Sequence, residues 1–191
     1  SPDGKYAVSA SDDKTLILWD LISGQAIHTL SGHRKFVSSV AISPDGKYAV
    51  SASDDKTLIL WDLISGQAIH TLSGHRKFVS SVAISPDGKY AVSASDDKTL
   101  ILWDLISGQA IHTLSGHRKF VSSVAISPDG KYAVSASDDK TLILWNLISG
   151  QYITCFYGDW PFYHCAIAPD GVSIVAGDQG GNVHFFYLLE E

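Results

Sequence analysis

Residues 43–84 read SPDGKYAVSASDDKTLILWDLISGQAIHTLSGHRKFVSSVAI, and residues 1–42 and 85–126 repeat them without a change. A fourth copy stays identical from Ser127 to Trp145. Self-similarity at a fixed period of a few tens of residues is the signature of a repeat architecture. The sequence therefore predicts a row of equal structural units rather than one irregular core.

Each repeat reads as four short strands joined by turns. In the second copy the strands are expected at about residues 47–52, 57–63, 68–72 and 78–84, and the segments between them are rich in Pro, Gly, Asp and Ser. Several strands are apolar at consecutive positions, which is typical of a sheet covered on both faces. Sheets stacked side by side would provide that cover, so we expect an all-β protein.

Two residue pairs recur in every full copy, and they point to a known family. They are Gly-His at Gly32-His33, Gly74-His75 and Gly116-His117, and Trp-Asp at Trp19-Asp20, Trp61-Asp62 and Trp103-Asp104. With these pairs the chain resembles the WD-repeat (WD40) family over nearly all of its length. The resemblance implies a β-propeller of four-stranded antiparallel blades, in which the strand after Gly-His lies innermost.

The repeat pattern predicts one propeller domain over residues 1–191. Its repeat units are 1–42, 43–84, 85–126 and 127–167, followed by a partial terminal blade at 168–191. The chain starts at the second strand of a blade and ends at the third, which gives about 18 strands, or about four and a half blades. The missing initial Met leads us to expect a fragment of something larger.

An open stack of this kind exposes blade faces and strand edges to water. We therefore expect the chain to associate with itself. Because two-fold cyclic pairs are the commonest closed assembly, a homodimer that closes one ring of about nine blade equivalents is the preferred form.

The resemblance also implies a hydrogen-bonded tetrad in each blade. By matching positions the three tetrads are His33, Ser51, Asp55 and Trp61; His75, Ser93, Asp97 and Trp103; and His117, Ser135, Asp139 and Trp145. Such polar groups are costly to bury unless they satisfy one another. Ser53 is the alternative to Ser51.

A set of Ser, His and Asp also invites comparison with a hydrolase triad. A triad needs one exposed nucleophile beside an oxyanion site, whereas this set occurs in three equal copies. The copies favour a structural network, and we predict no catalytic residue.

The repeat drifts after Trp145, beginning with Asn146, and the tetrad disappears from the ending. Gly158-Asp159 replaces Gly-His and, after a deletion of one residue, Ala176, Gly180 and Phe186 stand where Ser, Asp and Trp are expected. The sequence predicts that packing holds this blade instead, with four aromatic candidates. They are Trp160, Phe185, Phe186 and Tyr187.

The stretches 165–171 and 183–185, which read CAIAPDG and VHF, are similar to the last blade of propellers at the C-terminus of bacterial multidomain signal-transduction proteins of the NACHT/NB-ARC-like type. This second resemblance implies a bacterial sensor-type module.

Charge excludes one class of partner. Each full repeat carries four acids and four bases, so the net charge of −6 arises from Ser127 onward, where two lysines face eight acids. Those acids are Asp129, Asp138, Asp139, Asp159, Asp170, Asp178, Glu190 and Glu191. Without a basic footprint we expect no nucleic-acid partner, and without a long apolar run we expect no membrane partner.

No cofactor or metal is predicted. One Asp of each Asp-Asp pair already belongs to a tetrad, and no calcium-loop spacing follows it. The Gly-rich segment 177–182 lacks a phosphate-loop lysine and falls at a hairpin turn. Cys155 and Cys165 are expected on strands too far apart to pair, and two free thiols suit the cytoplasm.

In the WD-repeat family, partners meet the face made by the loops before the inner strand and between the second and third strands. Here those loops carry a repeated Arg-Lys-Phe step and an acid that we expect to be exposed. The candidate binding residues are Arg34, Lys35, Phe36, Arg76, Lys77, Phe78, Arg118, Lys119, Phe120, Asp54, Asp96 and Asp138.

Three functions are therefore considered. The first is a non-catalytic protein-interaction scaffold or sensor fragment that binds a protein or peptide on this face. The second is an engineered or recently amplified repeat fragment that self-assembles and has no ligand. The third is an enzyme with a central-pocket site built from residues that break the repetition. These are Asp159, Trp160, His164 and His184.

Overall fold

The computed structural model describes residues 1–188 and contains eighteen strands in five antiparallel sheets. The first sheet has the order β1 (Tyr6–Ala10), β2 (Thr15–Asp20), β3 (Ala26–Ser31). The second has β4 (Val37–Ile42), β5 (Tyr48–Ser53), β6 (Thr57–Asp62), β7 (Gln67–Ser73), and the third β8 (Val79–Ile84), β9 (Tyr90–Ser95), β10 (Thr99–Asp104), β11 (Gln109–Ser115). The fourth has β12 (Val121–Ile126), β13 (Tyr132–Ser137), β14 (Thr141–Asn146), β15 (Gln151–Tyr157), and the fifth β16 (Phe162–Ile167), β17 (Ser173–Asp178), β18 (Val183–Tyr187).

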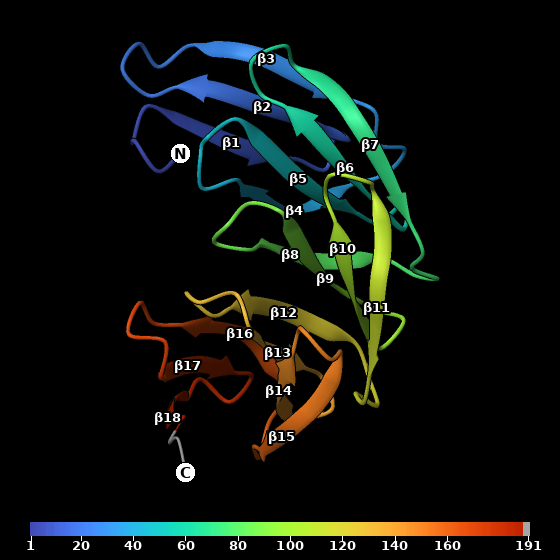
Figure 1. Ribbon diagram of the computed structural model, residues 1–191, viewed down its shortest axis with the longest axis vertical. Coiled ribbons are helices and arrows are strands. Elements are labelled where there is room, and N and C mark those ends of the chain that lie inside the picture. The colour runs from blue at the N-terminus through green and yellow to red at the C-terminus, as the bar shows by residue number, and fades with distance from the viewer. Residues whose placement is uncertain (189–191) are drawn as a thin grey trace.

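The sheets form an open arc (Figure 1). The inner strands β4, β8, β12 and β16 are neighbours along the concave side, and β3, β7, β11 and β15 lie on the outside. The all-β propeller fold with four-stranded antiparallel blades is thereby confirmed. In the described residues the first sheet begins with the second strand of a blade, and the fifth ends with the third.

Each repeat unit crosses from one sheet to the next, because its last strand is the inner strand of the following sheet. The fifth sheet accordingly takes β16 from the unit 127–167, so it starts before residue 168, and residues 189–191 of the predicted terminal blade lie outside the described residues. Within residues 1–188 no helix is long and apolar enough to span a membrane.

The core lies between sheets rather than inside them. Between the second and third sheets, Leu58, Leu60 and Leu72 on one side pack against Ile101 and Trp103 on the other. The same contact is built between the other neighbouring sheets. Since both faces of an internal sheet are buried in this way, its strands carry runs of apolar residues.

The turn between the second and third strands requires a left-handed backbone. Lys14, Lys56, Lys98 and Lys140 adopt φ of 70–75° there, and the fifth sheet has Gly181 in the same place, with φ of 84°. This turn holds the carboxylate of each tetrad.

Candidate functional site

The four predicted members of each tetrad lie in hydrogen-bond contact. In the second sheet, His33 precedes β4, Ser51 lies on β5, Asp55 in the following turn and Trp61 on β6. His33 Nδ1 lies 2.9 Å from Asp55 Oδ2, and His33 Nε2 lies 2.7 Å from Ser51 Oγ, which also accepts the Trp61 indole N–H at 2.8 Å. The same bonds recur at 2.7–3.0 Å in the third and fourth sheets.

Two of the tetrad bonds have a fixed direction. A carboxylate only accepts, so His33 Nδ1 donates to Asp55, and Trp61 can only donate to Ser51. Ser51 Oγ lies 2.7 Å from His33 Nε2, and its hydroxyl can also donate to the Ile59 carbonyl oxygen at 3.4 Å. No buried side-chain N or O atom of the described residues lacks a partner.

The Asp55 carboxylate has more partners than the sequence indicated. It accepts hydrogen bonds from the Thr57 amide at 3.0 Å and hydroxyl at 2.5 Å, and from the Arg34 amide at 2.8 Å. Burial by itself would raise the pKa of Asp55, but the bonds from Thr57, Arg34 and His33 outweigh it and lower that pKa. The Asp-x-Thr spacing, an Asx turn, was the signal that could have predicted the threonine.

Asp97 and Asp139 behave in the same way. Burial would raise the pKa of each, yet the bonds from His75 and Thr99, and from His117 and Thr141, hold both pKa values well below the usual range. These carboxylates are therefore ionised anchors for the turns around them.

Ser51 and Ser53 have separate roles. Ser51 has no exposed surface and already accepts the indole N–H, so its hydroxyl cannot reach a substrate. Ser53 Oγ accepts the Asp55 amide at 3.1 Å and is outside the tetrad. The geometry thus gives the Ser-His-Asp set a structural role.

The fifth sheet places Ala176, Gly180 and Phe186 at the tetrad positions, as their strand register shows. Trp160 occupies the space of the missing carboxylate, since a Cβ added to Gly180 would lie 2.5 Å from the Trp160 ring. A side chain at position 180 therefore cannot coexist with the indole in this position.

The prediction that packing alone holds this sheet is wrong in part. Of the four candidates only Phe186 joins the core, with its ring centre 4.6 Å from that of Phe156, while Trp160, Phe185 and Tyr187 are 50%, 67% and 66% exposed. Phe162, which was not among the predicted packing residues, is fully buried. Its ring lies in the core that the fourth and fifth sheets share.

A second polar cluster, also missed, replaces the tetrad. The buried Asp178 carboxylate contacts His184 Nε2 at 2.8 Å and accepts the Asn182 amide at 2.9 Å. These bonds, led by His184, lower the pKa of Asp178 to about 2. No sequence motif predicts this cluster. Asp178 stands at the position of Ser137 in the fourth sheet, and His184 stands at the position of Ile143.

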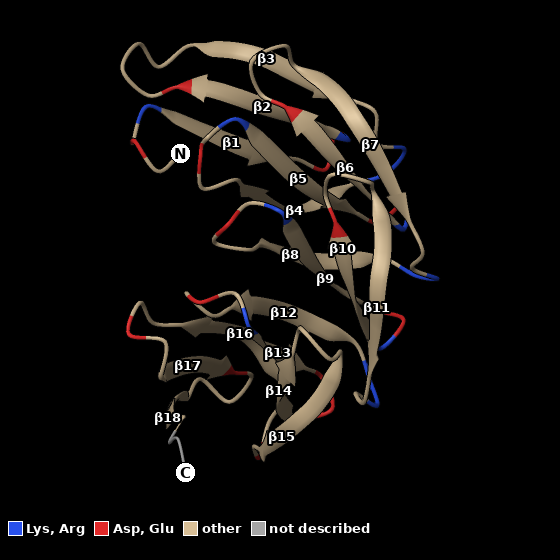
Figure 2. Cartoon of the chain, in the orientation of Figure 1, with Lys and Arg blue, Asp and Glu red and all other residues tan. Residues whose placement is uncertain are grey.

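One face of the arc is formed by loops of the second, third and fourth sheets, and we call it the top face. It comprises residues 34–36, 76–78 and 118–120 and the turns 54–56, 96–98 and 138–140. Charged residues gather in such loops and at strand ends rather than along the strands (Figure 2). Lys35 Nζ lies 5.2 Å from the Phe78 ring centre and Lys77 Nζ 5.6 Å from that of Phe120, so each sheet reaches the next.

The acids of the top face are less exposed than predicted. Asp54, Asp96 and Asp138 are partly buried, and Ser38 donates to Asp54 at 3.0 Å. Burial raises the pKa of Asp96, and the charges of Asp54 and Asp138 raise it further, because the three turns bring the carboxylates toward one another.

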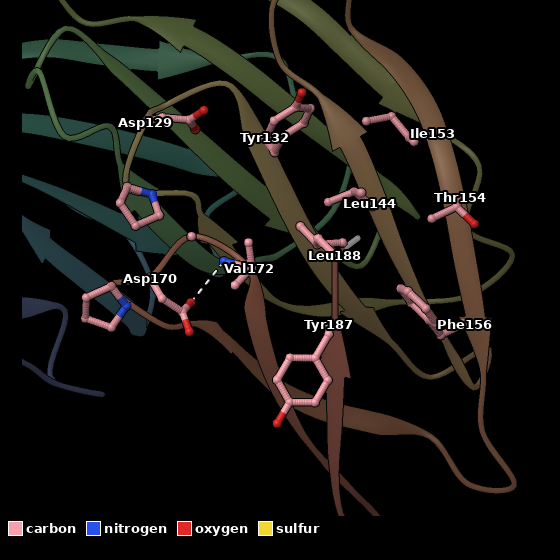
Figure 3. A pocket seen from close by; sticks show the side chains of 13 residues that line it. Asp129, Tyr132, Leu144, Ile153, Thr154, Phe156, Asp170, Val172, Tyr187 and Leu188 are labelled. Atoms are coloured by element: carbon pink, nitrogen blue, oxygen red, sulfur yellow. Dashed lines mark hydrogen bonds between the residues drawn. The ribbon is translucent and has the colours of Figure 1, made fainter. Parts of the chain in front are cut away.

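A cavity of about 590 Å³ lies between the fourth and fifth sheets, away from the top face (Figure 3). Tyr132, Leu144, Ile153 and Tyr187 are among its walls. The matching grooves between the earlier sheets measure about 260 and 270 Å³. One reason for the difference is Thr154, which stands where the other outer strands carry a histidine.

Those histidines connect neighbouring sheets. His28, His70 and His112 lie on outer strands, and each Nε2 lies 3.1–3.3 Å from the carbonyl oxygen of Ile64, Ile106 or Ile148 in the next sheet. These three histidines therefore link neighbouring blades by hydrogen bonds.

The residues considered for a central enzyme site are dispersed. Asp159 and Trp160 lie before β16, His164 is exposed on β16, and His184 on β18 is bonded to Asp178. β17 separates the two histidine strands. In residues 1–188 no three His, Cys, Asp or Glu side chains are grouped as a metal site would require, and both cysteines are free thiols.

Comparison with known proteins agrees with this geometry. The model of the WD domain, G-beta repeat family matches residues 1–20, 24–62, 66–104 and 108–146. Similar proteins include the nuclear distribution protein PAC1 of Mycosarcoma maydis, 45% identical over 40 residues, and that of Candida tropicalis, 44% over 45 residues. A subunit of chromatin assembly factor 1 from Gallus gallus is 42% identical over 38 residues. The matches cover 21%, 20% and 20% of this chain and 9%, 9% and 7% of those proteins.

Proposed function

The chain belongs to the WD domain, G-beta repeat family, and from this premise we propose that it is a non-catalytic protein-interaction scaffold whose top face binds a protein or peptide. One observation carries the proposal. The same exposed Arg-Lys-Phe step occurs on three successive sheets, and the lysine of one step lies over the phenylalanine of the next.

The chemistry of the step suits a peptide ligand. Arginine and aromatic side chains are over-represented among the residues that dominate interface energies. Arg76 donates its backbone amide to Asp97, so the tetrad holds the base of the loop while the side chain stays exposed. Three equal steps add weak contacts through effective concentration.

The similar proteins support the proposal only in general terms. One of them is by its name part of an assembly factor, but each matches the chain over only about one repeat. The alternative of an amplified repeat with no ligand rests on the unchanged copies, and a binding experiment decides between the two.

In the same proposal the working form is a pair of copies that share one ring, because the first and fifth sheets each leave an apolar face open. We also place the scaffold in the cytoplasm. Support comes from the two cysteines, Cys155 and Cys165, which are both free thiols.

Selection of a random peptide library against the purified chain tests the scaffold function. Enriched peptides are expected to bind the unmodified chain and to lose at least about tenfold in affinity when Arg76→Ala and Phe78→Ala are combined. Ile106→Ser, a change at an exposed position at the opposite end of the same sheet, should leave their affinity unchanged. A selection that enriches no peptide, or only peptides insensitive to the top-face variant, would favour the repeat without a ligand.

A further inference from the structure

Neighbouring sheets contact each other four times within residues 1–188, and in the first three contacts the two surfaces carry the same apolar residues. We call the surface that faces the following sheet the front and the one that faces the preceding sheet the back. In the contact between the first two sheets, Leu16, Leu18 and Leu30 form the front. Ile59, Trp61 and Leu63 of the second sheet form the back.

Among residues 1–188, no sheet covers the back of the first sheet. Its residues Ile17, Trp19 and Leu21 match Ile59, Trp61 and Leu63 in sequence, but Leu21 is 54% exposed, whereas Leu63 is 6% exposed. The sequences are identical, but the first sheet has neither a described sheet before it nor an inner strand of its own, and the difference in burial arises from these two differences. This surface therefore has the shape and chemistry that, elsewhere in the molecule, a blade front covers.

The front of the fifth sheet is open as well. By strand register, Val183 and Phe185 on β18 correspond to Leu142 and Leu144 on β14, which are buried against the fifth sheet. Phe185 is 67% exposed, whereas Leu144 is 6% exposed. Phe185 is larger than Leu144, whereas Val183 and Gly177 are smaller than their counterparts Leu142 and Ala136 in the fourth sheet. The described front of the fifth sheet is formed by β17 and β18, since no outer strand is described there.

We infer that a second copy of this chain covers both surfaces, with the front of the fifth sheet of each copy packed on the back of the first sheet of the other. The four internal contacts show which kind of surface each open one accepts. A front cannot pack on a front in this way, so the contact joins unlike surfaces, and two copies placed in this order use every open face and close a ring. The open ends of the arc are visible in Figure 1.

This inference rests on the pairing in the proposed function and assigns its surfaces. Two variants block one surface each. Leu21→Arg blocks the back and Phe185→Arg blocks the front, and because both side chains are more than half exposed in the single chain, neither change disturbs its own core. Ile22→Arg is the matched control, since Ile22 lies in the same turn as Leu21 and is 83% exposed.

The mass in solution, measured by light scattering over a concentration series, gives the readout. The unmodified chain and Ile22→Arg are expected at twice the 20.6 kDa chain mass, and Leu21→Arg and Phe185→Arg each at the single mass. An equal mixture of the two blocked variants should return to twice the chain mass, because one open front and one open back remain.

Each of the other outcomes refutes either the pairing itself or the surfaces assigned to it. An unmodified chain that stays at the single mass at high micromolar concentration refutes the pairing, with no bearing on peptide binding at the top face. A pair that survives both substitutions, or blocked variants that fail to combine on mixing, refutes the assigned surfaces while the pairing stands.

Discussion

The third and fifth sheets place their first three strands in the same order, yet different side chains hold them together. The third closes its turns with a buried chain of Trp103, Ser93, His75 and Asp97. The fifth moves the carboxylate to Asp178, on the strand itself. The first sheet adds a third case, since it has the repeat sequence but no Gly-His pair before it, and its Asp13 accepts bonds only from Thr15. A complete tetrad therefore needs the inner strand and the Gly-His loop before it, which come from the preceding repeat unit, as well as the second and third strands of the sheet.

The largest expected effect comes from acid, which acts on all three tetrads at once. The folded pKa values of Asp97 and Asp139 are held below the usual range, chiefly against burial by hydrogen bonds from His75 and His117. A carboxylate with a lowered folded pKa adds stability above its unfolded pKa, near 4, and that stability is lost as the pH falls through the folded value. The urea midpoint, followed by tryptophan fluorescence, should therefore fall steeply below about pH 4.

Paired substitutions sharpen this prediction. Asp97→Asn combined with Asp139→Asn should flatten the fall between pH 4 and 2, since fewer carboxylates then remain to be protonated. Asp12→Asn, an exposed change in the first sheet, should leave the slope as it was. Equal slopes in all three proteins would show that the tetrads do not set the acid stability.

Sequence alone predicted the regular part of the molecule well and the irregular part poorly. Copies with a fixed period predict strand number and sheet order, because each unit repeats the same turn chemistry. The raised pKa of Asp96 could not be foreseen, since it arises from burial and from the charges of Asp54 and Asp138, which lie in turns of two other sheets. Nor could the pairing of Asp178 with His184, because neither residue occupies a position that carries a polar group in the other tetrads.

The same carboxylate has fewer partners in the first sheet than in the third. Asp97→Ala removes four hydrogen bonds and leaves buried donors of His75 and Thr99 unpaired, which should lower the free energy of unfolding by about 3 kcal/mol. Asp13→Ala changes the same sequence position in a sheet with no tetrad, so its effect on urea unfolding should be much smaller. If the two variants were equally destabilised, the histidine bond would have no net value.

The smallest effect concerns the link between sheets. His112 Nε2 lies 3.3 Å from the Ile148 carbonyl oxygen and its ring covers Gly150, whereas the next outer strand has Thr154 in that place, beside the cavity of about 590 Å³. His112→Thr makes the third junction resemble the fourth and should lower the free energy of unfolding by about 0.5–1 kcal/mol, the usual net value of one hydrogen bond. Repeat stability is close to a sum of unit and nearest-neighbour terms, so hydrogen exchange should quicken in the fourth sheet around Ile148 and stay unchanged in the first. Faster exchange throughout the chain would mean that the sheets unfold as one body and that the junctions cannot be weakened one at a time.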